Sequence, residues 1–214
     1  MIHNTIHMKK YCFVFLLFAS IYSCKNVHDT SVTTNVVESK AFKKLQYNDT
    51  FAIPPESIFH LTDTFKTSGN KNFTLADLKG KPTVLAMIFT NCGYACPRLT
   101  SDINNIREKL YDNKQKINFV LVSFDTKRDT PQQLQRYAKQ MELDSNWILL
   151  HGSDETVRTL SVLLNVQFEK DADGNFSHSN VITVLGKNGL INFRKEGLEV
   201  DHTETLLKLK TLIN

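Results

Sequence analysis

The chain has 214 residues, of which 41% are hydrophobic and 14 are phenylalanine, so it has enough apolar side chains to build a core. This composition excludes intrinsic disorder and a miniature fold held together by disulfides. The formal net charge is +4, and removing residues 1–23, which contain Lys9 and Lys10, leaves about +2, a balance that implies no nucleic-acid-binding patch.

The first 23 residues have the pattern of an export signal. The basic pair Lys9-Lys10 precedes an apolar run over 11–22, which is shorter than the roughly 20 residues that a helix needs to span a bilayer. The segment Ile21-Tyr22-Ser23-Cys24 resembles a bacterial lipobox, whose cysteine becomes acylated, although a tyrosine replaces the usual small residue. We expect a signal peptide of the lipoprotein type over 1–23, lipidation of Cys24, and a membrane-anchored protein facing the periplasm or the cell exterior.

Residues 24–53 are rich in Thr, Ser, Asn, Val and Lys and show no helical periodicity, which predicts a flexible tether. Pro54-Pro55 closes this segment, because proline donates no backbone hydrogen bond and favours an extended chain. The folded domain is therefore expected over 54–214.

The expected domain opens with a β-hairpin, whose strands over 58–61 and 72–75 flank the turn-rich segment 67–71. Strands and helices then alternate. The pattern predicts strands over 84–89, 117–123 and 148–150, helices over 96–111, 131–141 and 154–164, then a hairpin of strands over 181–185 and 190–194 and a closing helix over 203–213. This order implies parallel strands with right-handed crossovers and an antiparallel edge, so the expected fold class is α/β with a mixed central sheet.

Cys92 and Cys96 follow the first buried strand, where a helix is expected to begin. Unpaired N–H groups and the positive end of the helix dipole favour thiolates there. A gap of four positions would place both sulfurs on one helical face, close enough to form a disulfide or to share one soft metal ion. The alternative is a structural disulfide, or two cysteines of the hydrophobic core. Removal of Cys12 with the signal peptide and acylation of Cys24 would leave this pair as the only free thiols.

A thiol pair after the first buried strand is the arrangement of the thioredoxin superfamily. Three segments, TNCGYACP at 90–97, SFDTKRDTP at 123–131 and His178-Ser179, together resemble the SCO/SenC family, and the resemblance spans roughly 54–213. It implies a thioredoxin-like fold and a periplasmic or membrane-tethered copper-binding protein that helps assemble the binuclear copper centre of cytochrome c oxidase. It also implies Cys92, Cys96 and His178 as the copper ligands.

Two thiolates and one imidazole form a soft donor set that suits Cu(I) and tolerates Cu(II) with an added water, whereas zinc would prefer a fourth ligand. His178 follows the polar segment 171–177, so we expect it on a loop that swings towards the cysteine turn. Ser177 stands where the family commonly has aspartate, which removes a carboxylate that would orient the imidazole. For Asp125, Arg128 and Asp129, a charge-paired turn is as good an interpretation as a direct role in the site.

The resemblance leaves three functions to compare. The first is a metallochaperone, which would not be an enzyme. Its partners would be the oxidase subunit that carries the binuclear copper site and a protein that donates copper. The second is a thiol-disulfide oxidoreductase, in which redox-active Cys92 and Cys96 keep the copper-site cysteines of a partner reduced and are themselves restored by a thiol reductant. The third, a peroxidase-like thiol protein, lacks the neighbouring threonine and arginine motif. All five prolines lie at or before position 131, so no cis-proline follows as in thioredoxin-like oxidoreductases, which favours metal binding.

Overall fold

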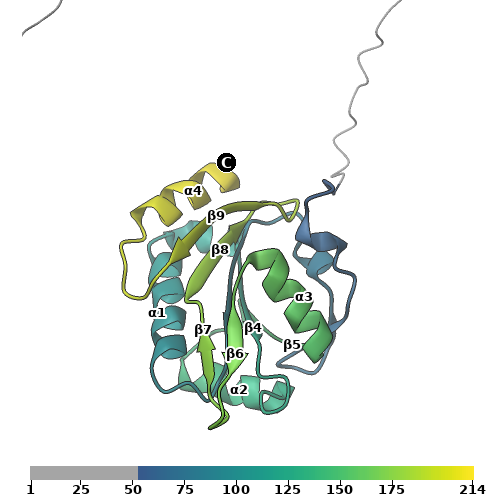
Figure 1. Ribbon diagram of the computed structural model, residues 1–214. Helices are drawn as coiled ribbons and strands as arrows, with labels where there is room; N and C mark the ends of the chain where they lie inside the picture. The colour runs from purple at the N-terminus through teal and green to yellow at the C-terminus, as the bar shows by residue number, and fades with distance from the viewer. Residues whose placement is uncertain (1–52) are drawn as a thin grey trace, which may run out of the picture. The chain divides into compact units, whose positions relative to one another are not determined.

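The computed structural model describes residues 53–214 (Figure 1). The predicted signal peptide, the predicted lipidation site Cys24 and all but the last residue of the predicted tether lie outside the described residues. Within residues 53–214, none of the helices combines the length and the apolar character needed to cross a membrane.

Seven strands form the main sheet, in the order β2-β1-β5-β4-β3-β8-β9. The central strands are continuous apolar runs whose residues are almost all buried, as expected for a sheet covered on both faces. Strands β3, β4 and β5 are parallel, whereas β1, β8 and β9 each pair antiparallel with a neighbour. Their bounds are β1 Phe65–Thr67, β2 Asn72–Phe73, β3 Thr83–Ile88, β4 Asn118–Ser123, β5 Trp147–His151, β8 Val181–Leu185 and β9 Ile191–Glu196.

Four helices cover the sheet: α1 Ala95–Glu108, α2 Pro131–Gln140, α3 Asp154–Leu164 and α4 Thr203–Ile213. Figure 1 shows α1 and α3 on opposite sides of the central strands. Right-handed crossovers between the parallel strands β3, β4 and β5 put α1 and α2 on one face. Helix α3 lies in the connection that runs back from β5 to the antiparallel strand β8. The mixed sheet flanked by helices is confirmed.

One local expectation for the opening hairpin was wrong. Residues Ile58–His60 form a short 3₁₀ helix rather than a strand, because Ser57 caps it by accepting a hydrogen bond from the N–H of Phe59. The turn at 67–71 instead joins β1 to β2. The sequence also gave no expectation of β6, Phe168–Lys170, and β7, Phe176–His178, which pair antiparallel as a second, two-stranded sheet.

Candidate metal centre

The two cysteines lie at the junction between β3 and α1, but not as neighbours on one helix. The helix begins at Ala95, so Cys92 belongs to the preceding turn. The backbone N–H of Cys96 donates a hydrogen bond to Sγ of Cys92 over 3.3 Å, which brings the sulfurs together. Both cysteines are free thiols in the structure.

The thiols differ in exposure. Cys92 is half-buried, whereas the side chain of Cys96 is fully buried. Cys96 belongs to the core-facing stripe of α1, which continues through Leu99 and Ile103 at helical spacing. Its sulfur accepts a hydrogen bond from the N–H of Phe89 at 3.4 Å. One thiol of the pair therefore faces the outside and the other faces the core.

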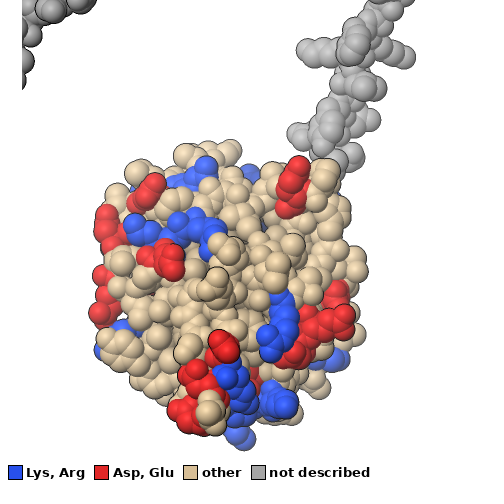
Figure 2. Space-filling view, in the orientation of Figure 1, with Lys and Arg blue, Asp and Glu red and all other residues tan. Residues whose placement is uncertain are grey.

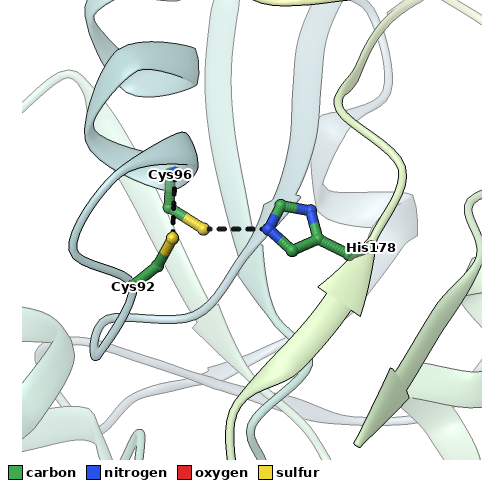
Figure 3. Close-up of side chains that lie close together, drawn as sticks. All are labelled: Cys92, Cys96 and His178. Atoms are coloured by element: carbon green, nitrogen blue, oxygen red, sulfur yellow. Dashed lines mark hydrogen bonds between the residues drawn. The ribbon is translucent and has the colours of Figure 1, made fainter. Parts of the chain in front are cut away.

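His178 completes the group, although it does not lie on a loop. It is the last residue of β7, and its Nε2 atom lies 3.6 Å from Sγ of Cys96 (Figure 3). The two sulfur atoms and one imidazole nitrogen all lie within 4.8 Å of one another. Within residues 53–214, this is the one group of three or more histidine, cysteine or acidic residues close enough to share a metal ion.

The second ring nitrogen fixes which atom of His178 faces the sulfurs. Nδ1 lies 3.2 Å from the carbonyl oxygen of Ser179. A carbonyl oxygen only accepts, so Nδ1 carries the proton and the lone pair of Nε2 points to Cys96. Ser177 lies on the other face of the strand and donates to the carboxylate of Asp171. In many metal sites a carboxylate orients the histidine ligand, and here the position before His178 is Ser177. The backbone carbonyl of Ser179 orients the imidazole instead.

Aromatic rings enclose the imidazole. Phe89 meets it edge-on with ring centroids 5.9 Å apart, and Phe124 lies at 5.1 Å. Burial among these groups lowers the pKa of His178, and the Ser179 carbonyl offsets part of that effect. The ring is therefore neutral at neutral pH, which is the form that binds metal ions.

The two thiols also differ in acidity. Burial opposes ionisation of Cys92, but N–H groups at the start of α1, led by that of Cys96, outweigh it and lower the pKa of the Cys92 thiol. Burial raises the pKa of Cys96 far above its usual range, and the nearby Cys92 adds to this effect. In the metal-free protein Cys92 is thus the nucleophilic sulfur, and Cys96 keeps its proton until a cation replaces it.

The buried carboxylate of Asp129 supports the turn that carries Cys92. Asp129 is fully buried and accepts hydrogen bonds from the N–H of Thr90 at 2.8 Å and from its hydroxyl at 2.5 Å. The hydroxyl of Ser123 donates to the same carboxylate over 2.6 Å. Thr90 stands two residues before Cys92, so Asp129 fixes the start of the thiol turn to the end of β4. Of the two interpretations that the sequence allowed for Asp129, the structure supports bracing of the turn rather than contact with the sulfurs.

The sequence did not reveal the aromatic surroundings of His178 or the β6–β7 hairpin that carries it. Phe168 stacks on Phe124 with centroids 4.9 Å apart, and Phe176 contacts both Phe89 and Phe124. A signal was present, because Asp173-Gly174 is a common hairpin turn and each flank carries a phenylalanine. The other described histidines lie elsewhere: His60 at the surface near Pro54, His151 in β5, and His202 beside Asp102.

The donor set limits the metals that the site could hold. Two sulfurs and one neutral imidazole make a soft, three-coordinate group, which fits copper in the cuprous state. A structural zinc site needs four ligands, and the described residues offer three. A surface groove lined by residues 167–169 and 177–179 includes His178 but neither cysteine. Of the two sulfurs, that of half-buried Cys92 is the more exposed.

Several known proteins are similar to this chain in sequence. The SCO1 protein homolog of Bacillus subtilis (strain 168) is 32% identical over 94 residues, which cover 44% of this chain and 49% of that protein. The chain spans about half the length of that curated relative, and 59% and 60% of the next two.

Solved structures share the fold over most of their length. A SCO1/SenC family lipoprotein from Bacillus anthracis str. Ames is 27% identical with a TM-score of 0.66, covering 71% of this chain and 92% of that one. The copper-bound ScoI of Arabidopsis thaliana is 26% identical with a TM-score of 0.59, covering 71% and 93%. The sequence profile of SCO1/SenC matches residues 52–214. The chain is therefore a member of the SCO1/SenC family.

Proposed function

We propose that this protein is a copper chaperone that binds the ion through Cys92, Cys96 and His178 and delivers it to the binuclear copper centre of cytochrome c oxidase. The observation that carries the proposal is the convergence of three donor atoms within 4.8 Å. Copper is cargo here. The oxidase as recipient rests on what the SCO/SenC resemblance implies, and an exported, membrane-anchored state rests on the signal and lipobox pattern that ends at Cys24.

The geometry suits transfer by exchange of ligands. A three-coordinate soft cation accepts an incoming sulfur or nitrogen ligand from a recipient without first losing one of its own. Half-buried Cys92 gives that ligand an approach, whereas buried Cys96 holds the ion from the core side. Rebinding of a proton by Cys96, whose thiol strongly favours the protonated form, accompanies release.

A second candidate function follows from the unequal thiols. Cys92 is accessible and has a lowered pKa, and buried Cys96 lies directly behind it, which suits attack on a partner's disulfide. Attack by the Cys92 thiolate forms a mixed disulfide and releases one partner thiolate. Cys96 then passes its proton to the released partner thiolate, and its attack on the Cys92 sulfur releases the second partner thiolate and leaves a Cys92–Cys96 disulfide. An external dithiol reductant must restore the pair, so copper binding would be incidental in this function.

A copper titration separates the two functions. The purified, fully reduced protein should bind one Cu(I) ion, and His178→Ala should weaken binding while still forming the Cys92–Cys96 disulfide on oxidation. The loaded protein should then metallate a soluble fragment of the oxidase subunit that carries the binuclear site. Failure of the reduced protein to bind copper, together with reduction of an oxidised fragment, would replace the chaperone with the reductase.

The membrane anchor needs its own measurement. Mass spectrometry of the mature protein should show an N-terminus at Cys24 that carries acyl chains. A mature chain that begins elsewhere, or an unmodified Cys24, would remove the proposed lipid anchor without affecting the copper site.

A further inference from the structure

Arg128 joins the segment that supports the cysteines to the hairpin that carries the histidine. We propose that Arg128 is a positioning residue, which holds His178 at the correct distance from Cys92 and Cys96. The inference rests on the proposed copper site, because the function assigned to Arg128 is to align the three ligands of that site. Arg128 touches none of the three donor atoms and acts through the hairpin.

The hairpin has few directional contacts that would fix its position. Strands β6 and β7 pair only with each other and form no ladder with the seven-stranded sheet. Their packing on the body is aromatic, through Phe168 and Phe176 against Phe89 and Phe124. Aromatic pairs prefer certain ring arrangements, but each pair contributes only modestly beyond its buried area, so a polar contact can add to fixing the hairpin along the surface.

One polar contact outside the metal group sets that position. Nη2 of Arg128 donates to the carbonyl oxygen of Gly174 over 2.6 Å, across a sequence separation of 46 residues. Apart from this bond and the contact between Cys96 and His178, residues 168–178 make no hydrogen bond to described residues beyond their immediate neighbours. Gly174 lies at the hairpin turn, four residues before His178, and the paired strands transmit its position to the imidazole.

The other edge of the guanidinium is fixed in the body of the protein. Nε of Arg128 donates to the carboxylate of Asp125, which is 1% exposed, and the Arg128 backbone N–H donates to the same carboxylate at 3.3 Å. The next residue, Asp129, accepts both hydrogen bonds from Thr90, ahead of the cysteine turn. Arg128 therefore holds the hairpin that carries His178, and the adjacent Asp129 holds the turn that carries the cysteines.

The contact to Gly174 distinguishes this role from a simple charge-paired turn. A turn would require only the pairing of Arg128 with Asp125, three residues apart, and a lysine would provide it equally well. A guanidinium presents donors on two edges in a rigid plane, so it reaches Asp125 and Gly174 at once. A lysine ammonium carries its three N–H donors on one nitrogen at the end of a flexible chain, so it cannot hold both partners in fixed geometry.

The test compares Arg128→Lys with Arg158→Lys as a matched control. Arg158 lies beside the same hairpin, with its guanidinium 5.3 Å from the ring of Phe168, and pairs with exposed Asp154 on α3. It makes no hydrogen bond to the hairpin among the described residues. Figure 2 shows basic and acidic side chains close together at the bottom of the view, where the β6–β7 hairpin ends in Figure 1. Both substitutions replace one positive charge by another.

Two readouts are expected to change in Arg128→Lys only. In the metal-free full-length protein, nuclear Overhauser contacts between the His178 and Phe124 rings should weaken. Cu(I) affinity should fall by about 10- to 100-fold, the range for a group that orients a ligand. In the double variant with His178→Ala, Arg128→Lys should cause little further loss, because the histidine that it positions is already gone.

The proposal would be overturned if Arg128→Lys changed neither the ring contacts nor the Cu(I) affinity. It would also be overturned if the double variant lost affinity by the product of the two single losses. If Arg128→Lys unfolds, as judged by circular dichroism, the same measurements are made on Arg128→Gln. If the wild-type protein binds no copper, the proposed function fails, but the metal-free ring contacts still decide the positioning role of Arg128.

Discussion

Nε2 of His178 lies 3.6 Å from Sγ of Cys96, although 82 residues separate them in the chain. The sheet topology explains their meeting. Strands β3 and β8 are antiparallel neighbours, with Ala86 opposite Ile182. The carboxyl end of β3 therefore meets the amino end of β8, so the turn after the first strand and the residues before the second share one edge of the sheet.

The thiols should differ in reactivity. In the reduced, metal-free protein, iodoacetamide should modify Cys92 and spare Cys96, because the pKa of Cys92 is lowered and burial raises that of Cys96. Each pKa unit changes the thiolate fraction about tenfold well below the pKa, so we expect a difference of at least about tenfold at neutral pH. Peptide mapping after timed alkylation measures both rates.

Cys92→Ser is the control for this experiment, since Cys96 should stay unmodified in it. As pH rises towards 9, the Cys92 rate should level off earlier than that of a free cysteine. Equal labelling of both residues in the folded wild-type protein would contradict the assigned burial.

Ionisation of His178 should couple to stability. Burial lowers its pKa in the folded protein below the usual 6.5, so the unfolded chain takes up the proton first as the pH falls. This stabilising contribution is complete above pH 6.5 and is lost as the pH falls towards the folded pKa. Urea unfolding of the metal-free wild type and His178→Gln between pH 5 and pH 8 isolates it, and a difference that is constant over this interval would argue against the buried, neutral ring.

Asp129 should show the opposite sign. Burial raises its pKa above 3.8, and the hydrogen bonds from Ser123 and Thr90 do not cancel that effect. The free energy of unfolding of the wild type therefore falls, relative to a variant without an ionisable group at position 129, as the pH rises from 3.8 through the pKa of Asp129 in the folded protein.

Asp129→Asn should be less stable than the wild type by about 1–3 kcal/mol near pH 4, because donors from Thr90 and Ser123 lose acceptors. That deficit should shrink as the pH increases. Denaturant unfolding of both proteins at several pH values measures it, and a deficit that grows with pH would refute the assigned shift.

Phe124 should be the most sensitive aromatic residue next to the site. It is 1% exposed and contacts the imidazole and both hairpin phenylalanines. Phe124→Ala should lower the free energy of unfolding by about 3–5 kcal/mol. Leu207→Ala, at a residue 59% exposed, should change it by no more than about 0.5 kcal/mol. Equal effects of the two substitutions on urea unfolding would contradict the aromatic cluster.

Periodicity and apolar runs predict most of this fold. The inward face of α1, the buried strands and the start of α2 at Pro131 are all present, because long elements repeat their pattern several times. Strands β6 and β7 have three residues each and lack such a pattern. Their position depends on rings that pack from distant parts of the chain, which no local signal records.

The cysteines were predicted from their placement after a strand, whereas their unequal burial was not. Exposure of each thiol depends on where α1 begins, and helix boundaries are the least certain feature of a sequence pattern. His178 was selected through the family resemblance, and only the three-dimensional arrangement gives its distance to the sulfurs and the orientation of its ring.

X-ray absorption spectroscopy of the Cu(I)-loaded protein tests the shared site most directly. The account predicts two sulfur ligands and one imidazole nitrogen in the wild type, and loss of the imidazole signal with retention of both sulfurs in His178→Ala. A wild-type spectrum with sulfur ligands alone, or one that His178→Ala leaves unchanged, would contradict it.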